Sequence, residues 1–147
     1  MELTRFTDYA LRVLMFLGSE PGRRSSIDEL ADFYSVSRHH IAKITKKLAA
    51  AGFIESTRGK NGGLVLNRAP ESIRIADVVR ATEPHFHLVE CFDSKKSVCT
   101  IDGCCGLKGI LYQARARFFA TLDQYTLADA IARSGQKGLA GKTATSP

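Results

Sequence analysis

The stretch SIDELADFYSVSRHHIAKITKKLAAAG, residues 26–52, contains two short helical patterns joined by a tight turn. Ser26 stands three residues before Glu29, which is the spacing of a capping box at the start of a helix. The turn SVS at 35–37 ends in Ser37, a residue type that commonly caps the N-terminus of the next helix. Gly52 ends the second pattern. Two short helices in this order predict a helix-turn-helix unit.

The second helix of this unit has two contrasting faces. The residues at the spacing of one buried helical stripe are Ile41, Ile44 and Leu48, and the opposite face carries His39, Lys43 and Lys46. Such a helix, apolar on one side and basic on the other, is typical of a recognition helix that enters the major groove of DNA. The residues that we expect to enter or flank this groove are Ser37, Arg38, His39, Lys43 and Lys46.

The segment that follows is typical of the wing of a winged helix. Residues 53–57 and 64–66 have strand-like composition, and RGKNGG at 58–63 is a glycine-rich turn between them. Glycine accepts positive φ and lets the backbone approach a sugar-phosphate chain closely. We expect Arg58, Lys60 and Asn61 to contact phosphate or the minor groove. The sequence thus predicts a mainly α-helical fold with a small β-hairpin wing, forming a DNA-binding domain over 1–84.

Helical patterns also flank this unit. An apolar stripe from Phe6 to Leu17 predicts a helix over about 4–17, and a short helix near 75–79 is stopped by Pro84. A long stripe from Leu107 to Tyr125 is broader than packing on one small domain requires. We expect this long C-terminal helix to dimerise with its copy in a second subunit, so that two recognition helices reach two half-sites.

The same patterns divide the rest of the chain into a loop, two C-terminal helices and a tail. A cysteine-rich loop occupies 85–106, and the capping box TLAD at 126–129 predicts a last short helix. The dimerisation helix and this short helix together span 107–134. We expect the tail 135–147 to be disordered, because it contains little apolar surface to bury.

The positive charge of the chain is concentrated near the recognition helix. The 147 residues have a formal net charge of +6, and between Ser37 and Asn61 six lysines and arginines stand against one glutamate. This concentration favours a phosphate-bearing partner such as DNA. Charged residues interrupt the apolar N-terminal segment, so we predict neither a signal peptide nor a membrane span. We expect a cytoplasmic protein with reduced thiols.

All four cysteines lie in CFDSKKSVCTIDGCC, residues 91–105. Seven residues separate Cys91 from Cys99, five separate Cys99 from Cys105, and Cys104 is the direct neighbour of Cys105. Such irregular spacing suits an iron–sulfur cluster better than a zinc site, whose ligands usually come in CxxC-like pairs. Three cysteines leave one coordination position open. The nearby residues that could fill it are Cys104, His85, His87, Asp93 and Asp102, and a partner subunit could also supply a ligand.

Several strings resemble the iron–sulfur winged-helix regulator family, whose branches include IscR-type regulators and NsrR-type nitric-oxide-sensing repressors. The resemblance covers about residues 1–131. It rests on LTRFTDYALR at 3–12, VSRHHIAKI at 36–44, RGKNGG at 58–63, IRIADVVRATEP at 73–84, YTLAD at 125–129 and the cysteine segment. IscR-like chains have a histidine three residues after the last cysteine, where this chain has Lys108. The resemblance therefore favours the nitric-oxide-sensing branch.

The resemblance implies a homodimeric transcription repressor, and not an enzyme, that binds a double-stranded DNA operator. It assigns Cys91, Cys99 and Cys105 as ligands of a [2Fe-2S] or [4Fe-4S] cluster and leaves Cys104 as an extra cysteine. It also implies that Asp8 can complete the coordination from the other subunit. Nitric oxide as the signal and repression as the sign of control come from the resemblance alone.

Two other functions stay open. A DNA-binding regulator of the same fold could respond to a different signal through its cluster or through a disulfide, formed between Cys104 or Cys105 and Cys91 or Cys99. An enzyme could combine a cysteine with a histidine, and the available histidines are His39, His40, His85 and His87. The sequence has no nucleophile motif, oxyanion arrangement or glycine-rich nucleotide loop, which argues against the enzyme.

Overall fold

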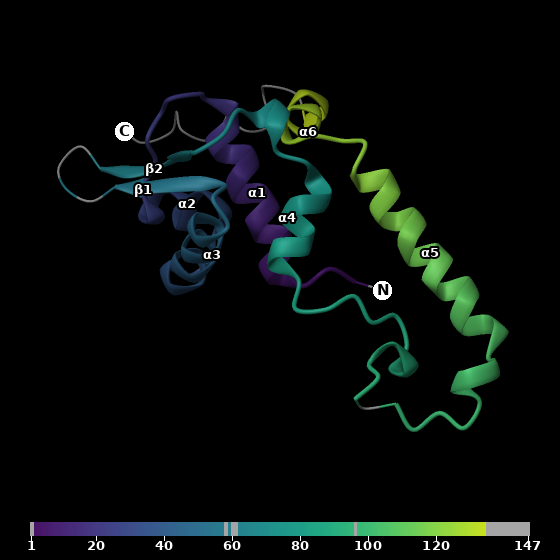
Figure 1. The fold of residues 1–147 in the computed structure, drawn as a ribbon. Helices are drawn as coiled ribbons and strands as arrows, with labels where there is room; N and C mark the ends of the chain where they lie inside the picture. Colours follow the sequence, from purple (N-terminus) through teal and green to yellow (C-terminus); the bar gives the residue numbers. More distant parts are fainter. Residues whose placement is uncertain (1, 58, 60–61, 96, 135–147) are drawn as a thin grey trace.

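The computed structural model describes residues 2–57, 59, 62–95 and 97–134. Its elements are α1 (Arg5–Ser19), α2 (Ile27–Tyr34), α3 (Arg38–Ala50), β1 (Ile54–Thr57), β2 (Gly63–Leu66), α4 (Ile75–Thr82), α5 (Gly106–Leu122) and α6 (Leu127–Ser134). Short 3₁₀ turns lie at Pro70–Ser72, Glu90–Phe92 and Asp102–Cys104. In Figure 1, α1 to α4, the hairpin and α6 form one unit, and α5 with the cysteine segment extends to one side. The predicted mainly helical fold with a small hairpin wing is confirmed.

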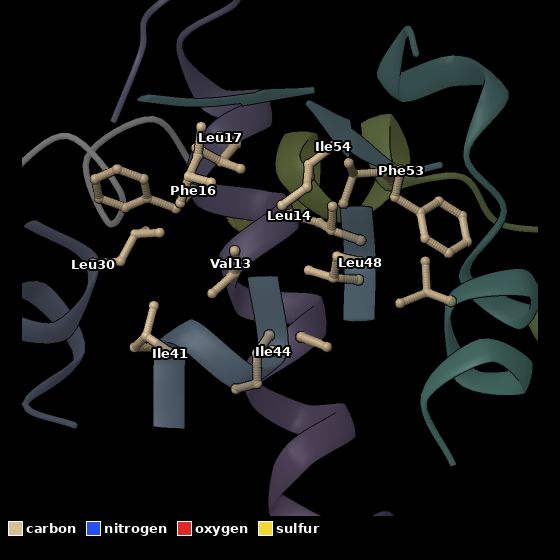
Figure 2. Close-up of a cluster of buried hydrophobic side chains, with 14 of the residues drawn as sticks. Val13, Leu14, Phe16, Leu17, Leu30, Ile41, Ile44, Leu48, Phe53 and Ile54 are labelled. Atoms are coloured by element: carbon tan, nitrogen blue, oxygen red, sulfur yellow. The ribbon is translucent and has the colours of Figure 1, made fainter. Parts of the chain in front are cut away.

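The core of this unit is built around α1. Figure 2 shows side chains of α1, α2, α3 and the hairpin converging on one another. The fully buried side chains of α1, α2 and α3 are Ala10, Val13, Leu14, Leu30, Ile41, Ile44 and Leu48, together with the hydroxyl-bearing Thr7. Each helix buries one apolar stripe, and burial of apolar surface contributes roughly 25 cal/mol per Å². The recognition helix is therefore held on its inner side, and its outer side remains available.

Three serines mark the two ends of α2 and the start of α3. Ser26 Oγ accepts a hydrogen bond from the backbone N–H of Glu29 at 3.0 Å, and Ser37 Oγ accepts one from His40 N–H at 3.2 Å. Ser35 ends α2 in the left-handed conformation, with φ of 53°. Both serine caps are confirmed, but between the described residues Ser26 and Glu29 the reciprocal hydrogen bond of the predicted capping box is not formed. The carboxylate of Glu29 contacts Arg23, so the side chain of Glu29 serves as an ion-pair partner.

The hairpin pairs antiparallel, with Ile54 opposite Leu66 and Thr57 opposite Gly63. Ser25 extends this sheet through two backbone hydrogen bonds with Leu64. The N–H of Ser25 donates to the carbonyl oxygen of Leu64 at 3.0 Å, and the N–H of Leu64 donates to the carbonyl oxygen of Ser25 at 2.8 Å. A Cβ atom at Gly63 would lie 3.1 Å from the carbonyl oxygen of Ser25. The glycine thus permits the segment before α2 to approach the hairpin directly.

The last helix returns to the core of the N-terminal unit. Leu127 at the start of α6 is fully buried, and a Cβ atom at Gly18 would lie 2.7 Å from Ile131 Cδ1. The predicted capping box is present: Asp129 N–H donates to Thr126 Oγ1 at 3.3 Å, and Thr126 N–H donates to the Asp129 carboxylate at 2.7 Å. The hydrogen bonds that the backbone N–H and the hydroxyl of Thr126 donate to its carboxylate lower the pKa of Asp129. The sequence places α6 in one region with the long helix α5. In the structure, α6 packs on α1.

Helix α5 exposes apolar side chains. None of its residues, all of which the structure describes, is buried in the protomer, and Leu107 and Ile110 are 61% and 64% exposed. Within the described residues, no helix has the length and apolar character to cross a membrane. The tail 135–147, for which disorder is predicted, lies outside the described residues.

Candidate nucleic-acid interface and cysteine segment

The outer face of α3 carries the residues predicted to contact DNA. The exposed residues at its start and along this face are Ser37, Arg38, His39, Lys43 and Lys46. His40 lies on the inner side, edge-on to Phe6 and Tyr9 with ring centroids 6.2 and 5.7 Å apart. Two adjacent histidines therefore differ in role: His40 helps to seat α3 on α1, and His39 faces solvent.

An ion pair joins the starts of α2 and α3. Arg38 Nε lies 2.8 Å from Asp28 Oδ1, and both side chains are exposed. Arg38 is the first residue of α3, where the positive end of the helix dipole opposes its charge, and the carboxylate offsets this repulsion. The pair lines a groove of about 580 Å³ between α2, α3 and the hairpin, which also includes Lys46 and Thr57.

The described part of the wing is tied to the segment before α2. Arg24 donates from its guanidinium to Thr57 Oγ1 at 2.8 Å. Gly59 has a φ of +105°, which favours glycine at that position. Arg58, Lys60 and Asn61, predicted to contact phosphate or the minor groove, lie outside the described residues.

The cysteine segment is an irregular loop with short 3₁₀ turns. All four cysteines are free thiols, of which Cys91 and Cys105 are half-buried and Cys99 and Cys104 are exposed. Cys105 is the N-cap residue of α5. Figure 1 shows the segment running from the end of α4 to the start of α5, away from the hairpin. Free thiols on an irregular loop form a donor set that suits soft metal centres such as iron–sulfur clusters.

The thiols do not converge in the protomer. Among the described residues, no group of three or more His, Cys, Asp or Glu side chains is placed to hold a metal ion. Lys108, three residues after Cys105, forms an ion pair with Asp102. The hydrogen bond to Asp102 raises the pKa of Lys108, and the charge of Cys91 contributes in the same direction. The donor chemistry thus fits a cluster, and three-cysteine coordination requires rearrangement of the loop.

The residues considered for the open coordination position have other partners. His85 and His87 stack on each other with ring centroids 4.8 Å apart. Asp93 accepts a hydrogen bond from Lys95 N–H at 3.1 Å. Asp8 lies in the first turn of α1, where its carboxylate pairs with Arg12.

Glu83 links the start of the cysteine segment to α1. Its Oε1 accepts from the backbone N–H of Thr4 at 2.7 Å and from Thr4 Oγ1 at 3.0 Å. Thr4 is the N-cap residue of α1 and also accepts from Thr7 N–H. Sequence reasoning missed Glu83, and the one available signal was its place directly before Pro84 at the end of a helix.

A second link fixes the far end of α5. Arg80 of α4 donates to both carboxylate oxygens of Asp123 at 2.9 and 2.8 Å, and its guanidinium lies 4.7 Å from the ring centroid of Phe119. These contacts raise the pKa of Arg80 and lower the pKa of Asp123, in both cases chiefly through the shared hydrogen bonds. The C-terminal end of α5 is therefore held on α4 of the DNA-binding unit.

Comparison with known proteins finds transcriptional regulators that match most of the chain. The model of the Rrf2 family, described as iron-dependent transcriptional regulators, matches residues 3–133. The HTH-type transcriptional regulator NsrR of Bacillus subtilis (strain 168) is 47% identical over 132 residues, which cover 89% of this chain and 90% of that protein. The NsrR regulator of Shouchella clausii (strain KSM-K16) is 42% identical over 132 residues, 89% of either chain.

Solved structures share the fold. CymR (YrzC), the global cysteine regulator of B. subtilis, has a TM-score of 0.75 at 24% identity, over 92% of this chain and 99% of that one. IscR of T. potens has a TM-score of 0.74 at 20% identity, over 99% of this chain and 94% of that one.

Proposed function

The chain belongs to the Rrf2 family of iron-dependent transcriptional regulators, and from this premise we propose that it is a homodimeric, cytoplasmic DNA-binding repressor whose operator affinity depends on an iron–sulfur cluster that senses nitric oxide. The observation that carries this proposal is the coexistence of two features in one chain. An exposed basic face lies on a capped recognition helix, and four free cysteines lie in the loop that connects the DNA-binding unit to α5.

DNA binding is assigned to α3 and the wing. His39, Lys43 and Lys46 are exposed on the helix face opposite the core, so their side chains can enter a major groove. Arg38 and Ser37 flank them at the N-terminal end of α3, the end that usually meets base edges in helix-turn-helix proteins. Arg58, Lys60 and Asn61 at the tip of the wing are proposed to contact phosphate or the minor groove.

Metal binding is assigned to Cys91, Cys99 and Cys105, with Asp8 of the second subunit as the remaining ligand. The three thiolates suit iron–sulfur coordination, and the resemblance to the iron–sulfur winged-helix regulators leaves Cys104 outside the set. When bound, the cluster would supply iron sites with which a small diatomic can react. A carboxylate is a harder and more weakly held ligand than a thiolate, so Asp8 is the ligand that yields first.

The dimer is assigned to α5. Its exposed leucine and isoleucine side chains form apolar surface that a second copy of the same helix can cover. DNA readers with helix-turn-helix units bind two half-sites about 34 Å apart, one helical turn, and the dimer sets this spacing.

In this proposal, α1 couples the metal site to the recognition helices, because α1 carries Asp8. Asp8 lies one turn from the N-cap of α1, so a bond from Asp8 to the partner's cysteine segment constrains how the two DNA-binding units sit. Its release allows the recognition helices to leave their matched spacing. A hundredfold change in DNA affinity needs about 2.7 kcal/mol between the two states, which is within the range of ordinary allosteric coupling.

The test is anaerobic purification followed by iron and sulfide analysis, absorption spectroscopy and DNA binding before and after nitric oxide. The DNA is selected from a random library, because the operator is not known in advance. We expect a coloured protein with acid-labile sulfide that binds selected DNA and releases it after nitric oxide. Protein that lacks iron, sulfide and visible absorption but binds DNA would contradict the proposal.

A thiol switch is the second candidate. The exposure of Cys99 and Cys104 favours it, because solvent-accessible thiols are open to oxidation. In that case peroxide would change DNA binding in metal-free protein, and mass spectrometry would find a disulfide within the cysteine segment. Nitric oxide would have no effect on the absorption spectrum.

A further inference from the structure

Arg115 of α5 contacts two points of the cysteine segment. Its guanidinium donates to the carbonyl oxygen of Phe86 at 3.1 Å. The same group lies 4.8 Å from the ring centroid of Phe92, the residue directly after Cys91, and 4.8 Å from that of Tyr112. One side chain therefore holds both the beginning of the segment and the neighbour of its first cysteine against the helix.

Phe92 is itself firmly placed. Its ring stacks on Tyr112 of α5 with centroids 4.1 Å apart and 11° between the ring planes, and the residue is only 8% exposed. Stacked rings with a guanidinium beside them gain from aromatic and cation–π attraction as well as from burial. Phe86 packs edge-on against Phe119 of the same helix at 4.7 Å. Residues 86–92 are thus docked on α5.

The other end of the segment is fixed to the same helix. Cys105 is the N-cap residue of α5, and the ion pair between Asp102 and Lys108 ties the preceding turn to the first turn of the helix. Cys99 is exposed and lies between the two docked stretches. Two of the three proposed ligands therefore belong to one packed unit in the protomer, and the third lies on the loop that joins them.

We propose that Arg115 is a positioning residue for the metal site. By docking residues 86–92 on α5, it holds Cys91 against the helix that begins after Cys105, which reduces the rearrangement that the loop needs to complete the three-cysteine set. Ordering of part of a site before binding reduces the entropy lost on binding. This inference rests on the proposed cluster function and adds to it a residue that contributes no ligand atom.

The first experiment measures the clamp without metal. Reduced, metal-free full-length protein is treated with iodoacetamide for timed intervals, and mass spectrometry gives the alkylation rate of each cysteine. In Arg115→Ala we expect Cys91 to react about tenfold faster, which corresponds to a loss of about 1.4 kcal/mol of local protection. Cys99 should react at the wild-type rate. Arg117→Ala is the matched control, because Arg117 is exposed on the same helix.

The second experiment measures the metal site. After anaerobic reconstitution with iron and sulfide, Arg115→Ala should contain less cluster, lose iron faster to a chelator and have an altered visible circular dichroism spectrum. Arg115→Lys should recover part of each property, since an ammonium group keeps the charge over the rings but lacks the fork of the guanidinium. Recovery by lysine separates positioning from a general loss of structure.

Two outcomes would overturn the inference. One is an unchanged Cys91 alkylation rate in Arg115→Ala, and the other is an equal increase at all four cysteines with a lowered melting temperature. Failure of the wild-type protein to take up iron is different, because it contradicts the proposed function itself. The wild-type reconstitution reveals that failure without reference to any variant.

Discussion

Asp8 and Arg12 form a two-point ion pair on the surface of α1. Arg12 Nε donates to Asp8 Oδ1, and the terminal guanidinium nitrogen lies beside Asp8 Oδ2, each at 2.9 Å. An exposed pair at this spacing contributes about 0.3–0.5 kcal/mol, so a metal centre has little to displace when it takes the carboxylate. Arg12 has further contacts of its own, because its guanidinium lies 5.2 Å from the Tyr9 ring centroid and its carbonyl accepts from Tyr34 at 2.7 Å.

We expect Asp8→Ala to assemble a cluster on three cysteines, with solvent or a small thiol in the open position. Its absorption spectrum should differ from wild type, and nitric oxide should change its DNA affinity less. Asp8→Cys should hold the cluster more tightly and respond to nitric oxide more slowly, because thiolate is the softer ligand. Stopped-flow absorption and DNA titration measure both effects.

Arg12→Ala is the control for this prediction, because it removes the ion pair and leaves the carboxylate. It should keep the wild-type cluster spectrum. If Asp8→Ala leaves both the spectrum and the nitric oxide response unchanged, Asp8 serves only as the partner of Arg12 and as a favourable charge at the helix N-terminus. His87 would then be the next residue to test as a ligand.

Substitution of Cys91, Cys99 or Cys105 by serine should prevent stable cluster assembly and weaken operator binding. Each of these thiolates carries a share of the coordination that few neighbouring groups can replace. Cys104→Ala should keep the cluster, and iron and sulfide analysis after anaerobic purification measures the difference. If Cys104→Ala loses iron and Cys105→Ala retains it, the third ligand is Cys104.

Local features of the fold could be predicted from the sequence, and distant contacts could not. The caps at Ser26 and Ser37 depend on neighbours three residues away, so their spacing alone identifies them. Glu83 and Thr4 are 79 residues apart, and no periodic pattern links them. The capping box before Leu127 located the start of α6 but gave no sign that this leucine enters the core beside α1.

In the cysteine segment, too, the local chemistry could be predicted from the sequence and the distant contacts could not. Its residue types indicate soft-metal chemistry without any fold, because thiolate donors have the same preference wherever they lie. The docking of the segment on α5 depends on Arg115 meeting a carbonyl 29 positions away, and nothing in the helix sequence distinguishes Arg115 from Arg117 or indicates that partner. The proposed role of Asp8 as a ligand rests on the resemblance alone, because within the protomer its carboxylate is engaged by Arg12.

The recognition helix should contain both base-reading and phosphate-binding residues. We expect Lys43→Ala to weaken selected and random DNA alike and to reduce the salt dependence by about one phosphate contact. His39→Ala should cost more on selected DNA than on random DNA, by about 1 kcal/mol or more, if it meets a base edge. Fluorescence anisotropy over a series of salt concentrations separates the two effects. Equal losses on both DNAs would remove His39 from the specificity set.

Asp28 should raise sequence specificity through its ion pair with Arg38. The carboxylate repels phosphate and restrains Arg38 at the start of α3, so its loss leaves the guanidinium free to bind any backbone. Asp28→Asn should therefore tighten binding to random DNA more than to selected DNA, with a steeper salt dependence on random DNA. Asp32→Asn, an exposed aspartate on the same helix, is the matched control. An unchanged ratio of the two affinities would contradict this role.

Ile110→Glu should convert the dimer into a monomer. The side chain is 64% exposed in the protomer, so the substitution should change the stability of the folded chain by no more than about 0.5 kcal/mol. In a helix-to-helix interface, however, it would place two carboxylates in apolar surroundings, which is strongly unfavourable. Analytical ultracentrifugation should show half the wild-type mass, with unchanged far-UV circular dichroism and weaker binding to two-half-site DNA. Ala116→Glu, exposed on another face of α5, should remain dimeric. If both variants stay dimeric, α5 does not form the interface, and if Ala116→Glu alone dissociates, the interface uses the opposite face of the helix.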